Sequence, residues 1–284
     1  MKNFQTIASI AIGLAACLSL QSCGKPPEVA KDSGNAKSGK LVLTGSSTIA
    51  PLAAEIGKRF ESKHPGVRVD VQSGGSSRGV NDARQGLADI GMVSRALKDE
   101  EKDLQAFTIA RDGVGIIIHK DNPVSSLGDE QVVSIYTGKI TIWKNVGGKD
   151  GTITVVNKAE GRSTLELFTH YFKLKNSDIK AQVVIGDNQQ GIKTVAGNPN
   201  SIGYVSIGAA EYDINHGSPI KLLPVSGVAA TTENVKNGKF PISRPLNLIT
   251  KNKPEGLTNE FINFAQSPEV EDIVKEQNFV PISR

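Results

Sequence analysis

Three short loops rich in glycine, serine and threonine recur along the chain, and each stands between an apolar run and a stretch with helical periodicity. They cover residues 44–48 (TGSST), 73–79 (SGGSSRG) and 160–164 (EGRST). A helix N-terminus leaves backbone N–H groups without intrahelical partners and favours negative charge. Hydroxyls add neutral donors, and glycine lets the backbone approach a ligand closely. One such loop is typical of an ordinary helix cap, but three that meet would form a cage for a small oxyanion.

The order of the predicted elements indicates an α/β fold. Strands and helices alternate from residue 41 onward, which predicts a mostly parallel sheet with its binding loops at the carboxyl ends of the strands. Within this alternation, the acidic stretch 99–103 predicts the start of a helix. A second α/β unit follows residue 114, and residues 245–250 resemble a strand that returns to the first unit. We therefore expect two lobes joined by two crossover strands, with a ligand cleft between them. Lobe 1 would comprise 41–113 and 246–284, and lobe 2 would comprise 114–245.

The N-terminus is expected to be an export signal rather than part of the fold. Residues 1–22 combine an early lysine with an apolar run that is too short for a comfortable membrane span. The segment ends in Leu-Gln-Ser before Cys23, which resembles the lipobox of bacterial lipoproteins and implies cleavage and acylation at Cys23. A plain secretory signal with an incidental cysteine is the alternative. Residues 23–40 hold almost nothing to bury and are expected to form a flexible tether.

Composition excludes several classes of function. The formal charge of +4 is too small, and the basic residues are too dispersed, to predict nucleic-acid binding. After cleavage Cys23 is the one remaining cysteine, so we expect no disulfide. The histidines show no metal-ligand spacing, and we expect neither a metal nor a cofactor. They are His64, His119, His170 and His216.

One enzymatic alternative rests on residues 75–79, which match the G-x-S-x-G nucleophile elbow between a strand and a helix. Ser77 would then be the nucleophile, with Asp187 and His216 as candidate partners. An α/β-hydrolase, however, places several strands before its elbow, and this chain offers one or two after the tether. We therefore expect a binding protein and no enzymatic activity.

Three arginines near the loops are candidates for holding an anion, because a guanidinium is a charged fork of donors. Arg95 follows the strand predicted at 88–93, and it could either face the cleft or pair with Asp99. Arg162 lies inside the third loop, and it too could either face the cleft or pair with a carboxylate. Arg78 is expected to pair with Asp82, which lies one helical turn further on.

These residues together resemble the substrate-binding component of bacterial phosphate ABC importers, over essentially all of 41–281. The most specific segments are TGSSTIAP at 44–51, GGSS at 74–77, ADIG followed by Ser94 and Arg95, and IGYV at 202–205. The resemblance implies a two-lobed periplasmic-binding-protein fold, type II-like, that holds a dehydrated phosphate between the lobes. It also implies a set of phosphate ligands. These are the Thr48 hydroxyl, the Ile49 N–H, Ser76, Ser163 and Thr164, with Ser47, Ser77 and Ser94 as neighbours.

The third loop departs from the pattern of this family, which usually reads R-x-x-G-S-G-T. Lys158 stands at the usual arginine position, and an arginine has entered the loop as Arg162. The best-characterised branch also has an aspartate after the third strand that accepts the proton of hydrogen phosphate and repels sulfate. This chain has Ser94 and Arg95 there, so we consider Glu160 as a replacement acceptor or as a partner of Lys158 or Arg162.

The resemblance implies a lipid-anchored, exported protein that binds inorganic phosphate and delivers it to the membrane permease of an ABC importer. We expect a monomer on the periplasmic side of a bacterial membrane or on the cell surface. Within the same class, sulfate, molybdate or tungstate would be the alternative ligands. A serine esterase or phosphatase using Ser77 and a surface adhesin are the alternatives from other classes.

Overall fold

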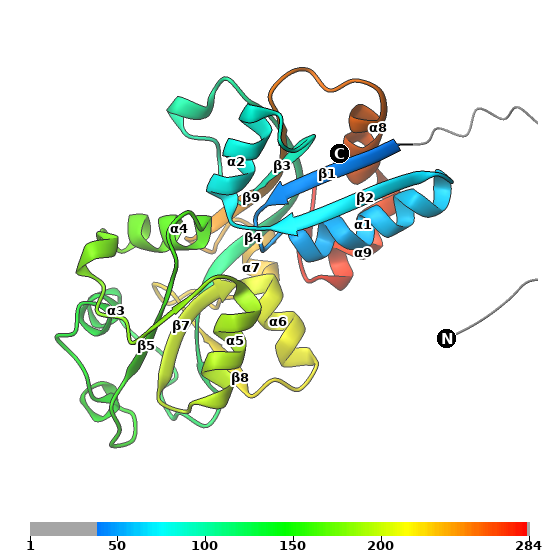
Figure 1. The fold of residues 1–284 in the computed structure, drawn as a ribbon. Coiled ribbons are helices and arrows are strands. Elements are labelled where there is room, and N and C mark those ends of the chain that lie inside the picture. The colour runs from blue at the N-terminus through cyan, green and yellow to red at the C-terminus, as the bar shows by residue number, and fades with distance from the viewer. Residues whose placement is uncertain (1–38, 283–284) are drawn as a thin grey trace, which may run out of the picture. The chain divides into compact units, whose positions relative to one another are not determined.

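The computed structural model describes residues 39–282, and the predicted signal segment, Cys23 and most of the predicted tether lie outside this range. Strands and helices alternate along nearly the whole described chain (Figure 1). The strands are β1 (Gly39–Gly45), β2 (Val67–Ser73), β3 (Ile90–Val93), β4 (Gln105–His119), β5 (Thr154–Lys158), β6 (Val183–Ile185), β7 (Ser201–Ser206), β8 (Ile220–Leu223), β9 (Ser243–Thr250) and β10 (Val280–Pro281). The α-helices are α1 (Ala50–Lys63), α2 (Ser76–Gln85), α3 (Asp129–Tyr136), α4 (Ser163–Tyr171), α5 (Asn188–Gly197), α6 (Ile207–Asn215), α7 (Thr232–Lys236), α8 (Gly256–Ala265) and α9 (Glu271–Glu276).

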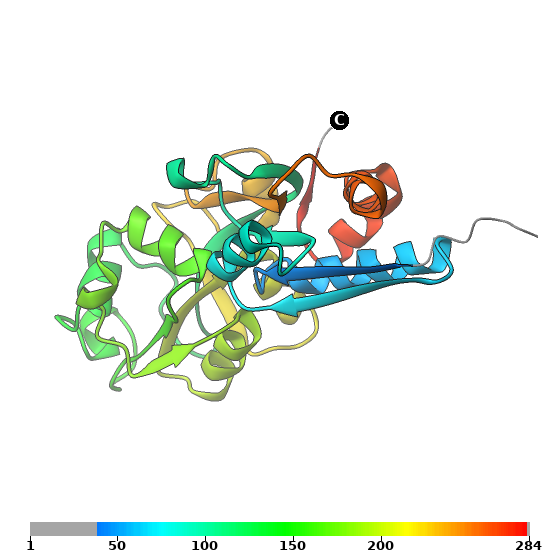
Figure 2. The same cartoon turned by 45° about the horizontal axis from the view of Figure 1, so that its top comes forward.

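Helix α1 shows how local sequence produces these elements. Its buried side chains Leu52, Ile56 and Phe60 recur every four residues and form one apolar face. Pro51 stands in the first turn, where a missing backbone N–H costs nothing, and the helix ends at His64 before a Pro-Gly pair. The helix lies along the parallel pair of strands β1 and β2, as two views show (Figures 1 and 2).

The strand order is β2-β1-β3-β9-β4-β7-β5-β6, with β8 and β10 also paired to β4. Strand β4 is the element that joins the two halves of this sheet. Its first part pairs antiparallel with β9 from Gln105 to Gly113, and its second part pairs with β7 and β8 from Val114 to His119. Strand β4 therefore runs from the first half into the second, and the chain returns to the first half at the start of β9.

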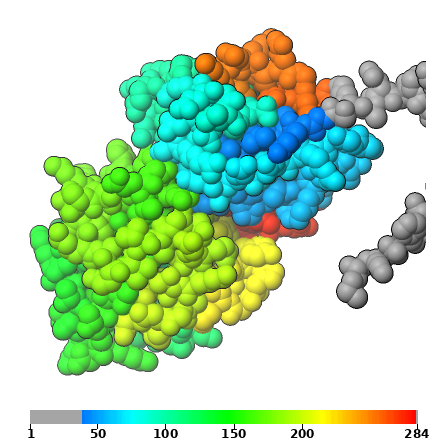
Figure 3. Space-filling model, viewed as in Figure 1, coloured from blue at the N-terminus to red at the C-terminus, as the bar shows by residue number. Residues whose placement is uncertain are grey.

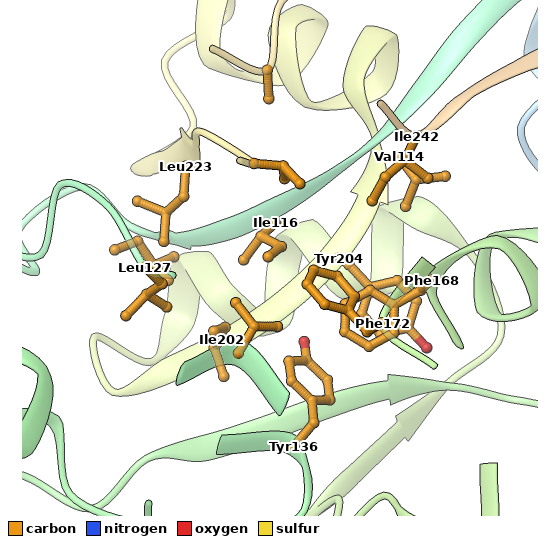
Figure 4. Close-up of a cluster of buried hydrophobic side chains, with 14 of the residues drawn as sticks. Val114, Ile116, Leu127, Tyr136, Phe168, Phe172, Ile202, Tyr204, Leu223 and Ile242 are labelled. Atoms are coloured by element: carbon orange, nitrogen blue, oxygen red, sulfur yellow. The ribbon is translucent and has the colours of Figure 1, made fainter. Parts of the chain in front are cut away.

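Buried side chains form separate clusters on the two sides of this crossing. One cluster gathers residues from 41–110 and 246–279, and the other, shown in Figure 4, is centred on residues 114–242. Phe168 and Tyr204 stack in the second cluster with ring centroids 3.9 Å apart. We call residues 39–113 and 243–282 lobe 1, and residues 114–242 lobe 2. In the space-filling view the cyan atoms of lobe 1 lie directly against the green and yellow atoms of lobe 2 (Figure 3).

Two expectations about secondary structure are wrong in detail. The acidic stretch 99–103 forms a single 3-10 turn, Asp99–Glu101, because Glu101 turns inward to bond Arg95 and the backbone N–H of Lys98. Strand β4 begins at Gln105, nine residues before the apolar run at 114 that predicts it. Its first part includes polar residues such as Asp112, which pairs with Arg244 instead of lying in a purely apolar environment.

Further short 3-10 turns cover Trp143–Val146, Asn176–Asp178 and Pro268–Val270. Between residues 39 and 282, no helix has the length and apolar character that crossing a membrane requires. No group of histidine, cysteine, aspartate and glutamate side chains in this range is arranged to hold a metal ion.

Candidate functional site: a cavity between the lobes

The three hydroxyl-rich loops meet around a small cavity of about 10 Å³. Lobe 1 contributes the loop between β1 and α1, the start of α2 and the end of β3, and lobe 2 contributes the start of α4. The volume is well below the roughly 300–1,000 Å³ of pockets for drug-sized ligands, so the cavity suits a small ion. Its lining residues are Ser46, Ser47, Thr48, Gly75, Ser76, Ser94, Arg162, Ser163 and Thr164.

Glycine is required where the second and third loops approach one another. Gly75 has a φ of +97°, and a Cβ atom there would lie 2.6 Å from the carbonyl oxygen of Gly161 in the other lobe. The N–H of Ser77 donates to that same carbonyl over 3.2 Å. The close contact between the lobes therefore depends on the absence of a side chain at position 75.

Hydroxyl groups form a continuous chain along the cavity wall. Ser46 donates to Ser94 over 2.8 Å, and the Ser94 and Ser163 oxygens lie 2.6 Å apart. Ser163 also lies 3.0 Å from the hydroxyl of Ser76. The two hydrogen bonds of Ser163 cross from lobe 1 to lobe 2, so hydroxyls that line the cavity also hold the lobes together.

Behind this wall lies a buried ion pair between Arg244 of β9 and Asp112 of β4. The two residues stand opposite one another in the β4–β9 ladder, and their side chains are 0% and 1% exposed. The Arg244 Nε and Nη2 atoms lie 3.1 and 2.8 Å from Asp112 Oδ2. Its remaining N–H groups donate to Thr48 at 3.1 Å, to Thr164 at 3.0 Å, and to Ser94. A guanidinium has five N–H donors, and these partners occupy all of them.

A second buried cation, Lys158, lies at the end of β5. Its ammonium group donates to Asn188 Oδ1 over 2.9 Å, and Lys158 is 2% exposed. Burial, reinforced by the nearby charge of Arg244, lowers the pKa of Lys158 from 10.5 to about 7. The amide of Asn188 in turn donates from Nδ2 to the Thr48 hydroxyl over 3.1 Å, which links Lys158 to the cavity wall.

The electrostatic character of the cavity is positive. Arg162 lines it, and the Arg162 Nε atom is buried without a hydrogen-bond partner among the described residues. No carboxylate belongs to the lining set within residues 39–282. A buried donor without an acceptor is costly, so Arg162 is suited to donate to an anion in this cavity.

A larger hollow of about 390 Å³ borders the cavity and shares Ser47 and Thr48 with it. Its other lining residues include Ala209, Tyr212 and Phe279, and its wall is largely apolar. The donors converge on the small cavity, so we assign the anion to that cavity and not to the larger hollow.

Comparison with known proteins agrees with this geometry. A family model described as a PBP superfamily domain matches residues 30–269. The phosphate-binding protein PstS of Staphylococcus saprophyticus is 31% identical over 270 residues, which cover 89% of this chain and 81% of that protein. PstS of Bacillus subtilis is 29% identical over 274 residues, covering 92% of this chain and 89% of its own length.

The chain belongs to the PstS family of phosphate-binding proteins. Its fold is similar to that of a phosphate ABC transporter substrate-binding protein from Clostridium perfringens, whose crystal structure contains bound phosphate. That similarity has a TM-score of 0.79 and 34% identity, and it covers 86% of this chain and all of the other. A phosphate transport receptor from Vibrio cholerae is similar with a TM-score of 0.70 and 29% identity over 86% of this chain. The expected family and its two-lobed fold are thus confirmed, and the family's members are named as binding proteins, not enzymes.

Most residues expected to contact the anion lie in the cavity wall. The structure brings seven of them together there, from both lobes. They are Ser47, Thr48, Ser76, Ser94, Arg162, Ser163 and Thr164. Their role as phosphate ligands stays a prediction.

Four other candidate residues lie outside the lining. The Ile49 N–H lies 3.4 Å from the Ser46 hydroxyl, and the Ser77 N–H bonds Gly161. Glu160 is exposed and accepts a hydrogen bond from Asn176, which gives it no access to a proton on a ligand in the cavity. The fourth is Arg95.

Arg95 needs a correction, because neither of the two expected roles describes it. Its guanidinium is buried in a bidentate pair with Glu101, at 2.6 and 2.8 Å, and Arg95 Nε lies 2.9 Å from Glu166 of lobe 2. Two carboxylates neutralise it, so it has no charge to spare for an anion. Arg78, by contrast, pairs with Asp82 over 3.0 Å as expected.

The residues of the enzymatic alternative do not form a triad. Asp187 caps α5 by accepting from the N–H of Gln190, and the His216 Nδ1 atom bonds the carbonyl of Tyr212. No hydrogen bond in the described part of the chain joins Ser77, Asp187 and His216.

Sequence reasoning missed Ser46, Arg244, Asp112 and Asn188. An arginine at the start of an apolar strand and an aspartate two residues before an apolar run were the available signals, since a charge in such a place needs a buried partner. The pairing itself is not visible in the sequence, because Asp112 and Arg244 are 132 residues apart.

Proposed function

We propose that this chain binds inorganic phosphate in the cavity between its lobes and delivers it to an ABC-type membrane importer. The observation that carries the proposal is the convergence of hydroxyls and of Arg162 on one small cavity that no described carboxylate lines. Membership of the PstS family supports phosphate as the ligand, and so does the phosphate bound to the similar protein from Clostridium perfringens.

The anion is held by donors from both lobes. Arg162 supplies the charge, and Thr48, Ser76 and Ser163 supply neutral hydrogen bonds beside helix N-termini. A ligand that satisfies both lobes at once favours the closed arrangement. The hinge for closure lies where β4 passes into lobe 2 and where the chain returns to β9, at 113–114 and 242–245, so the lobe boundaries follow these two passages.

Export and anchoring belong to the same proposal. Residues 1–22 direct export, Cys23 is acylated, and the segment that follows tethers a monomeric receptor to the outer face of a membrane. Intact mass measurement of the mature protein tests this point. Acylation adds the mass of the lipid to a chain that begins at Cys23, and a C23A variant should be released without that mass.

Isothermal calorimetry of the detergent-solubilised protein, freed of bound anion by partial unfolding and refolding, tests the function. We expect one phosphate per chain, and we expect R162Q to weaken binding by at least tenfold because it removes a charge-assisted contact. A matched control is R78Q, which removes an arginine that pairs with Asp82 outside the cavity lining. Absence of phosphate binding by the wild-type protein would overturn the proposal.

A further inference from the structure

The hydrogen bonds around Thr48 determine which way its hydroxyl points. The Thr48 oxygen accepts one hydrogen bond from Arg244 Nη2 and a second from Asn188 Nδ2, each over 3.1 Å. A hydroxyl oxygen has two acceptor sites and one O–H donor. Both acceptor sites are therefore filled, and the O–H is left to donate elsewhere.

Neither donor can reverse its direction. Arginine has no acceptor, and Arg244 is fixed by Asp112. Asn188 is oriented by its own partners, since its Oδ1 atom receives Lys158 Nζ at 2.9 Å and the backbone N–H of Ser206 at 3.4 Å. A backbone N–H can only donate, so the oxygen of the Asn188 amide faces Ser206 and the NH₂ group faces Thr48.

A second chain of hydroxyls, which also includes a bond from Arg244, runs along the same wall. The Ser46 oxygen receives the N–H groups of Thr48 and Ile49 at 3.2 and 3.4 Å, so Ser46 donates its proton to Ser94. Ser94 also receives Arg244 Nη1 at 3.3 Å, so it passes its own proton to Ser163. The direction of every bond in this chain is set by a group that can only donate.

We propose that Arg244 and Asn188 are positioning residues which fill the acceptor sites of Thr48 and Ser94, so that the site holds phosphate as a dianion without accepting its remaining proton. This inference rests on the proposed function and concerns the form of the ligand that the site takes. Arg244 does not touch the anion, because its five donors are engaged elsewhere. It acts through the orientation of Thr48 and its neighbours.

Monofluorophosphate is the probe for this idea, because it is a tetrahedral dianion in which fluorine replaces the O–H of hydrogen phosphate. If no group accepts that proton, the two anions should bind wild-type protein with affinities less than about tenfold apart, measured by calorimetry at one pH where both are dianions. An accepted proton would instead favour phosphate by about tenfold or more, the usual worth of a hydrogen bond to a charged group.

N188D reverses the polarity of one bond with little change in shape. An ionised carboxylate only accepts, so Thr48 would donate to the new carboxylate and turn a free lone pair toward the cavity. That lone pair can accept the proton of phosphate but gains nothing from fluorophosphate. We expect the ratio of phosphate to fluorophosphate affinity to rise by about tenfold. R244K, which retains the charge but removes the fork that fills the Thr48 lone pair, should move the ratio in the same direction.

K193Q is the matched control for charge. Lys193 is exposed on the same helix as Asn188, and its replacement lowers the net charge by one, as N188D does. Its ratio should equal that of the wild-type protein. If N188D and R244K weaken both anions by equal factors, the two residues have only a structural role and the inference fails. If wild-type protein binds phosphate but fluorophosphate is weaker by tenfold or more, an acceptor exists and the inference fails alone. If the wild-type protein binds neither phosphate nor fluorophosphate in calorimetry, the proposed function itself is refuted.

Discussion

Burial of Lys158 makes the stability of the anion-free protein depend on pH in a definite direction. Its pKa is about 7 in the folded protein and 10.5 when freely exposed to water. Between these values the unfolded chain binds a proton that the folded chain has released. The free energy of unfolding therefore rises with pH between about 7 and 10.5. Above 10.5 the gain is complete, and it is lost again as the pH falls back toward 7.

The magnitude follows from the difference between the two pKa values. Each pH unit inside the window changes the free energy of unfolding by about 1.4 kcal/mol. From pH 7 to 9.5 the contribution of Lys158 is then roughly 3 kcal/mol, a large share of the 5–15 kcal/mol that is typical of folded proteins. K158M removes the titrating group, and Asn188 Oδ1 keeps its bond from the Ser206 N–H.

Urea unfolding followed by tryptophan fluorescence suits this measurement. The single tryptophan, Trp143, is buried in lobe 2, the lobe that also contains Lys158. The free energy of unfolding of the wild-type protein should gain about 3 kcal/mol relative to K158M between pH 7 and 9.5. K193Q, which removes an exposed lysine, should follow the wild-type curve. Parallel curves for wild-type protein and K158M would refute the reasoning.

Two further predictions concern contacts between the lobes. Glu166 lies 2.9 Å from Arg95 and 3.1 Å from Lys98 across the lobe boundary, so E166Q should weaken phosphate binding roughly fivefold, less at high salt, in calorimetry. E160Q removes an exposed carboxylate of the same lobe and should have no effect; an equal loss in both variants would contradict the assignment. G75A places a methyl group against lobe 2 and should weaken phosphate binding at least tenfold while circular dichroism stays native. G86A has a similar positive φ of +72° with open space around it, so it should lower the melting temperature slightly and leave affinity unchanged.

Local patterns in the sequence were sufficient for most of the secondary structure and for the loops of the site. The apolar spacing in α1 and the uninterrupted apolar run of β3 depend only on neighbouring residues. The same holds for the hydroxyl-rich loops, whose position between strand and helix places them at the cavity.

Contacts between residues that are far apart in the sequence could not be predicted from it. Asp112 and Arg244 meet because β4 and β9 pair in one particular register, and a shift by one residue would turn both side chains to other faces of the sheet. Arg95 was misassigned for the same reason. Glu166, which helps neutralise it, belongs to the other lobe, and Glu101 reaches it only because the predicted helix is a single turn.

The pairing of β4 with β9 at the lobe boundary determines how the protein would respond to a pulling force. The chain passes into lobe 2 at Val114 and returns at Ile242, and these two residues share a backbone hydrogen bond of 2.9 Å. Lobe 2 is therefore an insertion in lobe 1 whose first and last residues lie side by side. A pulling force applied between β1 and β10 would be carried across the β4–β9 ladder and would bypass residues 114–242 until that ladder ruptures. Lobe 2 would stay folded under tension while lobe 1 unravels around it.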